Sequence, residues 1–189
     1  MLIIDKARLL QSLDDYTLIA SLRLALLAQS RGECSTPMPM HLDIDPAHAE
    51  VHMKSSYRKG GKYFVLKLAS TFPHNVARGL EVGNGMLLLS SAETGVPLAL
   101  LADAGALTDI RTAAVGALVA QELGRQDSIL GILGTGIQAR LQAKMHAQVL
   151  DLKEVLVWGR SPERVRAYQQ DLAILLPRVQ VHPAASPSE

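Results

Sequence analysis

The sequence predicts an α/β protein in two parts: a mixed α+β domain and then the first half of a parallel, Rossmann-type sheet. Up to residue 101, one helical segment is followed by several strands, which is not the alternation of a parallel sheet. From residue 128 onward strands and helices alternate, as is typical of a parallel sheet with right-handed crossovers. A helix over 108–123 is the expected connector, so we place the domains at 1–124 and 125–189.

The first part is expected to begin with a helix over Leu9–Gln29, with Ser12 as its cap. Strand-like runs follow, and the strongest of them is rich in aromatic and β-branched residues. The last two runs flank a Glu-Thr-Gly turn, which predicts a hairpin. The expected strands are 41–44, 49–54, 63–69, 86–89 and 96–101.

The second part is expected to follow the connector helix, which Thr108 caps and Gly124 ends. Its strands are short apolar runs, and its helices are longer and mixed in polarity. The expected order is strand 128–133, helix 137–150, strand 154–158, helix 162–176 and strand 179–182. The remaining residues, 183–189, are expected to form a loop.

Composition narrows the class of protein. The chain has 189 residues and a net charge of +1, so it carries no broad basic surface for nucleic acid. No apolar run reaches the roughly 18 residues that a membrane span needs. The single cysteine, Cys34, has no internal disulfide partner and fits a reducing, cytoplasmic compartment.

The segment Gly134-Thr135-Gly136-Ile137-Gln138-Ala139 lies where a strand gives way to a helix. In this context the first glycine permits a tight turn, and Gly136 lets the backbone approach a pyrophosphate. Ala139 allows the helix to pack closely on the strand, and the helix N-terminus offers free N–H groups to phosphates. The segment therefore predicts dinucleotide binding, and the alternative is an ordinary tight turn.

The end of the next strand indicates which dinucleotide binds. NAD-dependent enzymes usually carry an acidic residue here, about 20 residues after the glycines. This chain has Arg160 and Ser161 instead, with Arg164 one turn later. Because the guanidinium group pairs well with phosphate, we predict a preference for NADP(H), with NAD(H) possible. The alternative is that Arg160 is a solvated turn residue.

Three cations outside this unit are candidates for substrate binding. Arg111 is predicted in the first turn of a helix, where the helix dipole disfavours a cation unless an anion lies nearby. Lys67 interrupts an apolar strand, so it either snorkels to solvent or points into a cleft. Lys54 shares a strand face with His52 and Glu50, and a solvated face is the simpler interpretation.

Several segments in order resemble the ornithine cyclodeaminase/mu-crystallin family, over most of the chain from Pro37 to Leu172. The resemblance implies a homodimer with a substrate-binding domain and a Rossmann domain that holds NAD(P)(H). It also implies hydride transfer at the carbon–nitrogen bond of a small α-amino or α-imino acid, as in ketimine reductases and alanine dehydrogenases. The segments are 95–101, 107–114, 131–140, 155–161 and Val65-Leu-Lys67 followed by Asn75-x-x-Arg-Gly79.

The resemblance also assigns roles to residues. Lys67 and Arg111 match the cations that hold the substrate carboxylate, and Arg111 lies between that carboxylate and the cofactor. We take these two as the catalytic pair, because such a clamp orients the imine carbon toward the nicotinamide. Lys54 and Asn75 are further substrate-binding candidates. The cofactor candidates are Asn84, Arg111, Thr112, Gly134, Thr135, Gly136, Ile137, Gln138, Ala139, Arg160, Ser161 and Arg164.

The chain also departs from the family pattern. The arginine expected after the proline-rich loop is missing from 37–43, and Lys54 is its possible replacement. Lys54 stands where the deaminase has an acidic residue, so it disfavours ornithine and favours a small imino acid. Asn84 is expected to replace a Ser or Thr that usually follows Arg-Gly-Leu. The family's catalytic aspartate falls beyond this sequence, so we expect a partial chain of a protein roughly twice as long.

The sequence therefore predicts an NAD(P)H-dependent imine reductase or amino-acid dehydrogenase. Within the same family, the alternative is ornithine cyclodeamination, which forms proline and ammonia. From another class, the alternative is a dimeric, crystallin-like fragment that binds nucleotide without turnover.

Overall fold

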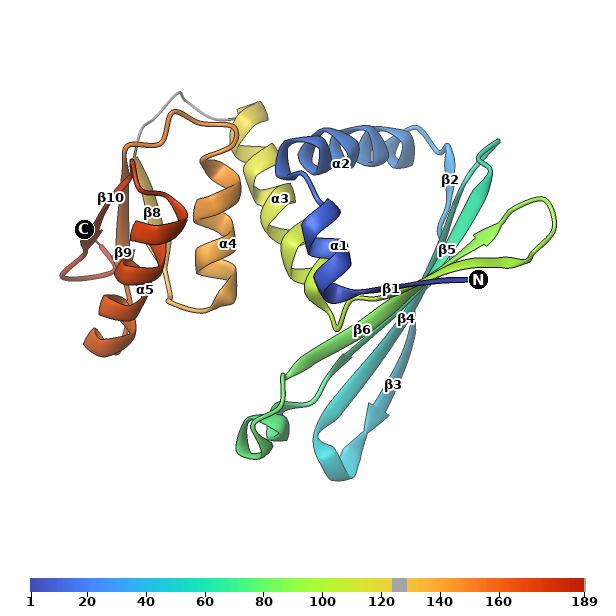
Figure 1. Cartoon of the computed structure of the whole chain (residues 1–189), viewed down its shortest axis with the longest axis horizontal. Helices are drawn as coiled ribbons and strands as arrows, with labels where there is room; N and C mark the ends of the chain where they lie inside the picture. Colours follow the sequence, from blue (N-terminus) through green and yellow to red (C-terminus); the bar gives the residue numbers. More distant parts are fainter. Residues whose placement is uncertain (124–128, 189) are drawn as a thin grey trace. The chain divides into compact units, whose positions relative to one another are not determined.

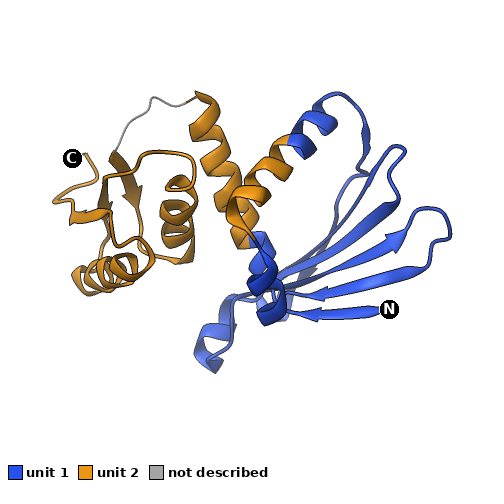
Figure 2. Ribbon diagram, turned by 45° about the horizontal axis from the view of Figure 1, so that its top comes forward, with its two compact units in different colours: residues 1–13, 24–108 blue, residues 14–23, 109–189 orange. Residues whose placement is uncertain are grey.

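The computed structural model describes residues 1–123 and 129–188 and divides into two compact units. Unit 1 comprises Met1–Leu13 and Leu24–Thr108, and unit 2 comprises Asp14–Arg23 and Asp109–Glu189 (Figure 2). The predicted boundary between residues 124 and 125, and the helix end predicted at Gly124, lie outside the described residues.

Unit 1 is built on a sheet in the strand order β1-β7-β6-β5-β4-β2, with β3 paired to β4 (Figure 1). All of its pairs are antiparallel except β1 with β7. The predicted hairpin is confirmed as β6 and β7. The strands are β1 Leu2–Asp5, β2 Cys34–Ser35, β3 Met40–Ile44, β4 Ala49–Arg58, β5 Tyr63–Thr71, β6 Gly83–Ser91 and β7 Pro97–Ala102. The unit also contains two 3-10 turns, η1 Asp45–Ala47 and η2 Pro73–Arg78.

The N-terminal region differs from the prediction. The single helix expected over Leu9–Gln29 is wrong, because the chain forms α1 Lys6–Ser12 and α2 Asp15–Ser30. Ser12 ends α1 and donates its hydroxyl to the Leu9 carbonyl oxygen instead of capping a helix. The capping carboxylates are Asp5, which accepts from the N–H of Arg8, and Asp14, which accepts from that of Thr17, both at 2.8 Å. Strands β1 and β2 were not predicted.

Helix α3, Ala106–Leu123, begins two residues before the predicted connector. Thr108 is therefore inside the helix and does not cap it. The buried carboxylate of Asp103 accepts a hydrogen bond from the N–H of Leu107 at 2.8 Å and so satisfies a free donor of the first turn. Arg111 lies in the second turn of α3, not the first as predicted, so the helix dipole acts on it less strongly.

Unit 2 confirms the alternation predicted from residue 128 onward. Its sheet has the order β10-β9-β8, and both pairs are parallel. Central strand β9 contributes Val155 and Val157 to a core that Tyr168 and Leu172 of α5 complete, and all four side chains are fully buried. The elements are β8 Ile129–Leu133, α4 Ile137–His146, β9 Glu154–Trp158, α5 Pro162–Leu175 and β10 Gln180–Pro183. Helix α4 thus ends four residues before its predicted end at 150.

Candidate functional site: a glycine turn and a two-lysine pocket

The glycine turn between β8 and α4 has the backbone that a phosphate cradle requires. Gly134 adopts a φ of 111°, a region that favours glycine, and donates its N–H to the Trp158 carbonyl oxygen at 2.8 Å. Gly136 caps α4 in an extended conformation. A Cβ atom built on Gly136 meets no atom within 4 Å, so the space above this residue is open. The turn is therefore held from the β9 side and leaves room for a ligand above Gly136.

The first turn of α4 supplies the donors for such a ligand. The N–H groups of Ile137, Gln138 and Ala139 have no acceptor within the helix, since its first internal bond runs from the Arg140 N–H, and the positive end of the helix dipole lies among them. Ala139 is buried in the core of unit 2, as its predicted packing role requires. Its carbonyl oxygen accepts a hydrogen bond from the buried Tyr168 hydroxyl at 3.2 Å, which fixes α4 on α5. This donor set fits a pyrophosphate group.

Arg140 holds the glycine turn through hydrogen bonds to its carbonyl oxygens, a role that was not predicted from the sequence. Its guanidinium group donates to the carbonyl oxygen of Thr135 at 2.5 Å and to that of Gly136 at 3.2 Å. The group also pairs with Asp171 of α5 at 2.7 Å and lies 5.4 Å from the Tyr168 ring centroid. Arg140 is thus a positioning residue for the turn. The available signal was a cation in the first turn of a helix, where the dipole disfavours it.

Gln138 connects the glycine turn to α3. Its side-chain amide nitrogen donates to both the backbone and the carboxylate oxygen of Asp109, each at 3.1 Å. Its buried side-chain oxygen has no hydrogen-bond partner among the described residues. Because a buried acceptor without a partner is costly, this oxygen is a candidate to accept a hydrogen bond from a ligand.

Arg160 and Arg164 form a basic corner at the tip of β9. Ser161 caps α5 and accepts from the Arg164 N–H at 3.3 Å, so its hydroxyl already has a structural role. Arg160 and Arg164 are exposed, and neither side chain has an ion-pair partner in the described part of the chain. A Cβ on Gly159 would meet Thr135 Cγ2 at 2.9 Å, so the tip packs directly on the glycine turn.

Arg111 and Thr112 lie next to each other in α3, within unit 2. Arg111 is exposed, and it makes no ion pair with any described residue. Thr112 is half-buried. The guanidinium group of Arg111 is thus accessible to an anion, although its place in the second turn removes the dipole argument on which it was first singled out.

The other predicted cations line a pocket within unit 1. Lys54 of β4 and Lys67 of β5 are directly opposed in the strand register, so both side chains project from one face of the sheet. They line a pocket of about 540 Å³ together with the proline-rich loop at Pro37–Pro39 and Leu87 of β6. Lys67 is half-buried, whereas Lys54 is exposed. Two ammonium groups in one partly apolar pocket fit a small carboxylate.

The two asparagine candidates have clear local roles in unit 1. Asn75 donates its side-chain amide to the Glu81 carbonyl oxygen at 2.9 Å and so closes the loop around η2. Asn84 is exposed at the start of β6 and accepts from the Gly85 N–H at 2.8 Å. Neither residue lines the two-lysine pocket.

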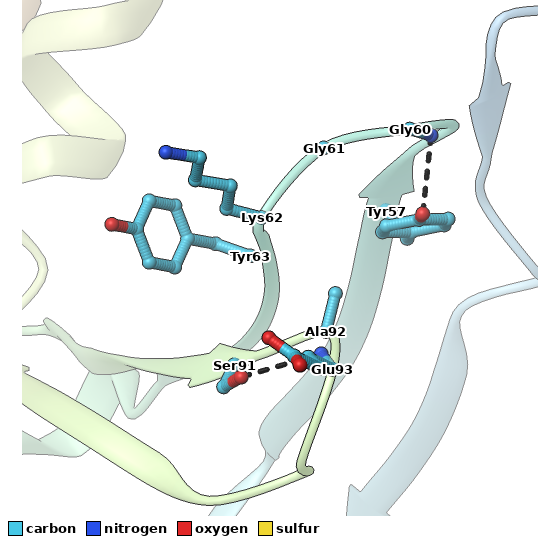
Figure 3. A pocket seen from close by; sticks show the side chains of 8 residues that line it. All are labelled: Tyr57, Gly60, Gly61, Lys62, Tyr63, Ser91, Ala92 and Glu93. Atoms are coloured by element: carbon cyan, nitrogen blue, oxygen red, sulfur yellow. Dashed lines mark hydrogen bonds between the residues drawn. The ribbon is translucent and has the colours of Figure 1, made fainter.

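A second pocket, of about 570 Å³, lies at the turn between β4 and β5 and the start of the turn between β6 and β7 (Figure 3). Its polar groups mainly hold turns, since Tyr57 accepts from the Gly60 N–H at 3.1 Å and Ser91 accepts from the Glu93 N–H at 3.2 Å. Its lining holds one lysine, Lys62, and one carboxylate, Glu93, so this pocket suits a carboxylate ligand less well than the two-lysine pocket.

The predicted site residues thus form two groups, one within each unit. Unit 1 carries Lys54 and Lys67 in one pocket, with Asn75 and Asn84 outside it. Unit 2 carries the glycine turn, the basic corner at Arg160 and the exposed Arg111.

Comparison with known proteins identifies the family of the chain. Residues 7–189 match the ornithine cyclodeaminase/mu-crystallin family. The chain belongs to this family. The resemblance inferred from its motifs and the predicted fold class, with the first part of a Rossmann-type domain, are both confirmed.

Relatives within the family carry the names of different reactions. An uncharacterized cyclodeaminase, y4tK, of Sinorhizobium fredii is 38% identical over 73% of this chain and 42% of its own length. A Delta(1)-pyrroline-2-carboxylate reductase of Bacillus cereus is 33% identical over 80% of this chain and 47% of its own length. The chain therefore spans about half the length of the curated relatives it matches.

A solved structure supports the fold and shows the ligands of a relative. The Delta(1)-pyrroline-2-carboxylate reductase of Thermococcus litoralis, in complex with NADH and L-proline, superposes with a TM-score of 0.90 at 26% identity. The match covers 98% of this chain and 57% of the reductase.

None of the helices in the described part of the chain is long and apolar enough to cross a membrane.

Proposed function

We propose that the protein is an NADP(H)-preferring reductase of a small cyclic α-imino acid, of the pyrroline-2-carboxylate type. The observation that carries this proposal is the open glycine turn at the N-terminus of α4, which fits a dinucleotide pyrophosphate. The two-lysine pocket of unit 1 supports the carboxylate end of the substrate. Lys54 disfavours a second ammonium group on the substrate, which argues against ornithine.

The chain's own residues would divide the work between cofactor and substrate. The N–H groups at the start of α4 bind the pyrophosphate, Arg140 keeps the turn in place, and the unpartnered oxygen of Gln138 accepts a hydrogen bond from the cofactor. Arg160, with Arg164, binds the 2′-phosphate. Thr112, Asn84 and Ser161 are further candidates for cofactor contacts.

The substrate would be held through its carboxylate. Lys67 and Arg111 bind this group and orient the imine carbon, with Lys54 as an additional cation and Asn75 supporting the neighbouring loop. These residues would hold the imine carbon where the nicotinamide of a bound reduced cofactor would supply hydride, and the imine nitrogen would take its proton from solvent to give the amine. Holding the reacting atoms in position accounts for much of the rate enhancement in such a reaction.

A homodimer through unit 1 is part of the proposal. The sheet face opposite Lys67 carries large apolar side chains that are exposed in the single chain, and contiguous exposed apolar surface marks interaction sites. These side chains are Met40, Leu42, Leu66, Leu68 and Met86. We expect the double substitution L66E/M86E to give monomers in sedimentation experiments, and a dimer that persists would contradict this interface.

The reaction is tested by cofactor oxidation with the intact protein. We expect NADPH to be oxidised in the presence of pyrroline-2-carboxylate, with proline as the product. A panel that includes pyruvate with amines distinguishes an amino-acid dehydrogenase. Absence of NADPH and NADH oxidation across this panel would reject the reductase, and conversion of labelled ornithine into proline would instead support the cyclodeaminase.

The cofactor preference is tested at the tip of β9. Replacing Arg160 with Asp removes the proposed phosphate partner and adds a carboxylate that can accept from a ribose hydroxyl. We expect R160D to weaken NADPH binding at least tenfold and to leave NADH binding equal or tighter. Unchanged NADPH affinity would refute the assignment of Arg160.

A further inference from the structure

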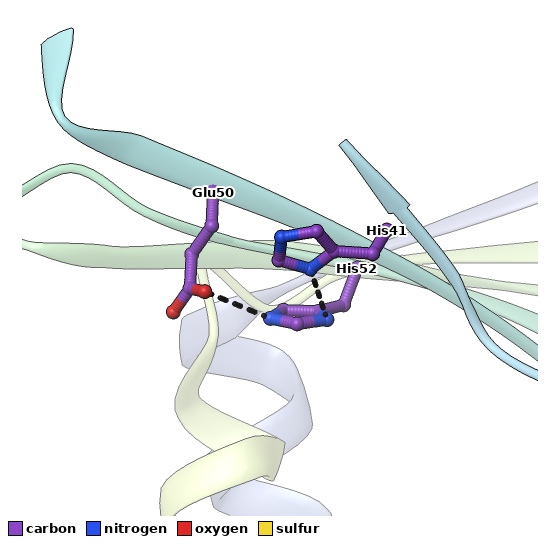
Figure 4. Close-up of side chains that lie close together, drawn as sticks. All are labelled: His41, Glu50 and His52. Atoms are coloured by element: carbon purple, nitrogen blue, oxygen red, sulfur yellow. Dashed lines mark hydrogen bonds and ion pairs between the residues drawn. The ribbon is translucent and has the colours of Figure 1, made fainter. Parts of the chain in front are cut away.

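Two histidines face each other on neighbouring strands of unit 1. His41 of β3 and His52 of β4 are directly opposed in the register, so both side chains lie on one face of the sheet. Their Nδ1 atoms are 3.3 Å apart, and their ring centroids are 4.6 Å apart (Figure 4). Asp43 and Glu50, the next opposed pair on this face, bring two carboxylates to the same place.

Each carboxylate contacts the outer nitrogen of one ring. His41 Nε2 lies 2.8 Å from Asp43 Oδ1, and His52 Nε2 lies 3.4 Å from Glu50 Oε2. A carboxylate at neutral pH only accepts, so His41 Nε2 donates its hydrogen to Asp43, and the Nδ1 atom of the neutral His41 ring is an acceptor. The close approach of His41 Nδ1 and His52 Nδ1 brings together two nitrogen atoms of the kind that binds metal ions.

The spacing of the two nitrogens suits a tetrahedral metal ion. Zn²⁺ binds histidine nitrogen at about 2.0–2.1 Å, which places two ligands of a tetrahedron roughly 3.3–3.4 Å apart. The observed Nδ1–Nδ1 distance of 3.3 Å agrees with this value. One ligand atom from each of His41, Glu50 and His52 also lies within 4.8 Å of the other two.

The outer contacts match those of known metal sites. Histidines that bind metals usually donate their second N–H to a carboxylate, which fixes the ring and its tautomer. Asp43 accepts this hydrogen bond from His41, and Glu50 lies beside the outer nitrogen of His52 as an ion-pair neighbour. The two carboxylates also offset the charge that a divalent cation would bring to a face already carrying Lys54.

We propose that His41 and His52 bind one divalent transition-metal ion, such as Zn²⁺, through their Nδ1 atoms. Asp43 and Glu50 orient the two rings, and water completes the coordination. The site belongs to the first unit alone and does not depend on the proposed reductase activity.

The test is Zn²⁺ titration by calorimetry on the metal-free intact protein. We expect one ion per chain with micromolar affinity, at least tenfold weaker binding in both H41Q and H52Q, and a smaller loss in D43N. The matched control is H48Q. It alters the other close histidine pair, His48 and His74, whose ring centroids are 5.4 Å apart, and it should bind as the wild type does.

A second measurement needs no variant. Co²⁺ added to the wild-type protein should give the intense visible absorption of a tetrahedral site, and Zn²⁺ should displace it stoichiometrically. Absence of Zn²⁺ binding, octahedral-type Co²⁺ absorption, or undiminished binding in H41Q or H52Q would each overturn the proposal. If a variant fails to fold, as judged by circular dichroism, the Co²⁺ spectrum of the wild type decides the question.

Discussion

Replacing Gly136 with alanine should separate cofactor binding from stability. A Cβ at this position meets no protein atom within 4 Å, so the fold can accept it. Loss of glycine entropy in the unfolded chain stabilises by about 0.4–1 kcal/mol. Alanine is a poorer N-cap than glycine, at a cost of roughly 0.5–1 kcal/mol. The two effects nearly cancel, and we expect a change in unfolding free energy within about 0.5 kcal/mol.

Cofactor affinity should respond differently, because the methyl group enters the space where the pyrophosphate approaches. We expect calorimetry on the intact protein to show NADPH binding weakened at least tenfold, which is about 1.4 kcal/mol. The matched control is G131A in β8, where a Cβ also meets no atom within 4 Å but no phosphate contact is proposed. NADPH affinity that is unchanged in G136A, or equally reduced in G131A, would refute the cradle.

Three further substitutions test the roles of Arg140, Lys67 and Tyr168. R140M removes the bonds to the turn carbonyls and the pair with Asp171, and it should cost about 1–3 kcal/mol of stability and weaken NADPH binding. Chemical denaturation should show a smaller loss in D171N, which keeps the carbonyl bonds, and equal losses would contradict the role of Arg140 in holding the turn. K67M should lower kcat/KM for the imino acid at least 100-fold, about 2.7 kcal/mol, whereas K62M in the other pocket should leave kcat/KM unchanged. Steady-state kinetics test this, and equal effects of the two substitutions would contradict the substrate role of Lys67. Burial raises the pKa of Tyr168 above its usual value near 10, so the folded state favours the neutral phenol, and the stability that this preference contributes is lost as pH rises above 10. The alkaline unfolding of Y168F should lack this part of the decline, and identical pH profiles of the two proteins would contradict the prediction.

The sequence predicted the elements from β8 to β10 well because each of them carries a local signal. Strand β9 is a short apolar run, and α5 begins with a capping serine followed by proline. The N-terminal region was harder to predict because Leu9–Gln29 is rich in apolar residues on both sides of the break between α1 and α2, and because Asp14 and Asp15 fit the first turn of one long helix as well as the start of a new one. Strand β1 has only four residues and is defined by its parallel pairing with β7, a partner distant in sequence.

For the candidate site, a pattern located the glycine turn, but not what supports it. Arg140 bonds to the turn directly and is itself held by Asp171, a residue of the next helix, and such a contact has no fixed spacing in sequence. The opposition of Lys54 and Lys67 likewise depends on the register of β4 on β5, which strand alternation alone does not specify. The pairing of His41 with His52 depends on the register of β3 on β4 in the same way.

A crystal structure of the intact protein with NADPH and L-proline tests the central claim most directly. We predict the pyrophosphate on the N–H groups of Gln138 and Ala139, the 2′-phosphate on Arg160, and the proline carboxylate on Lys67 and Arg111. A dinucleotide bound away from the start of α4, or a carboxylate that contacts neither Lys67 nor Arg111, would contradict the proposed site.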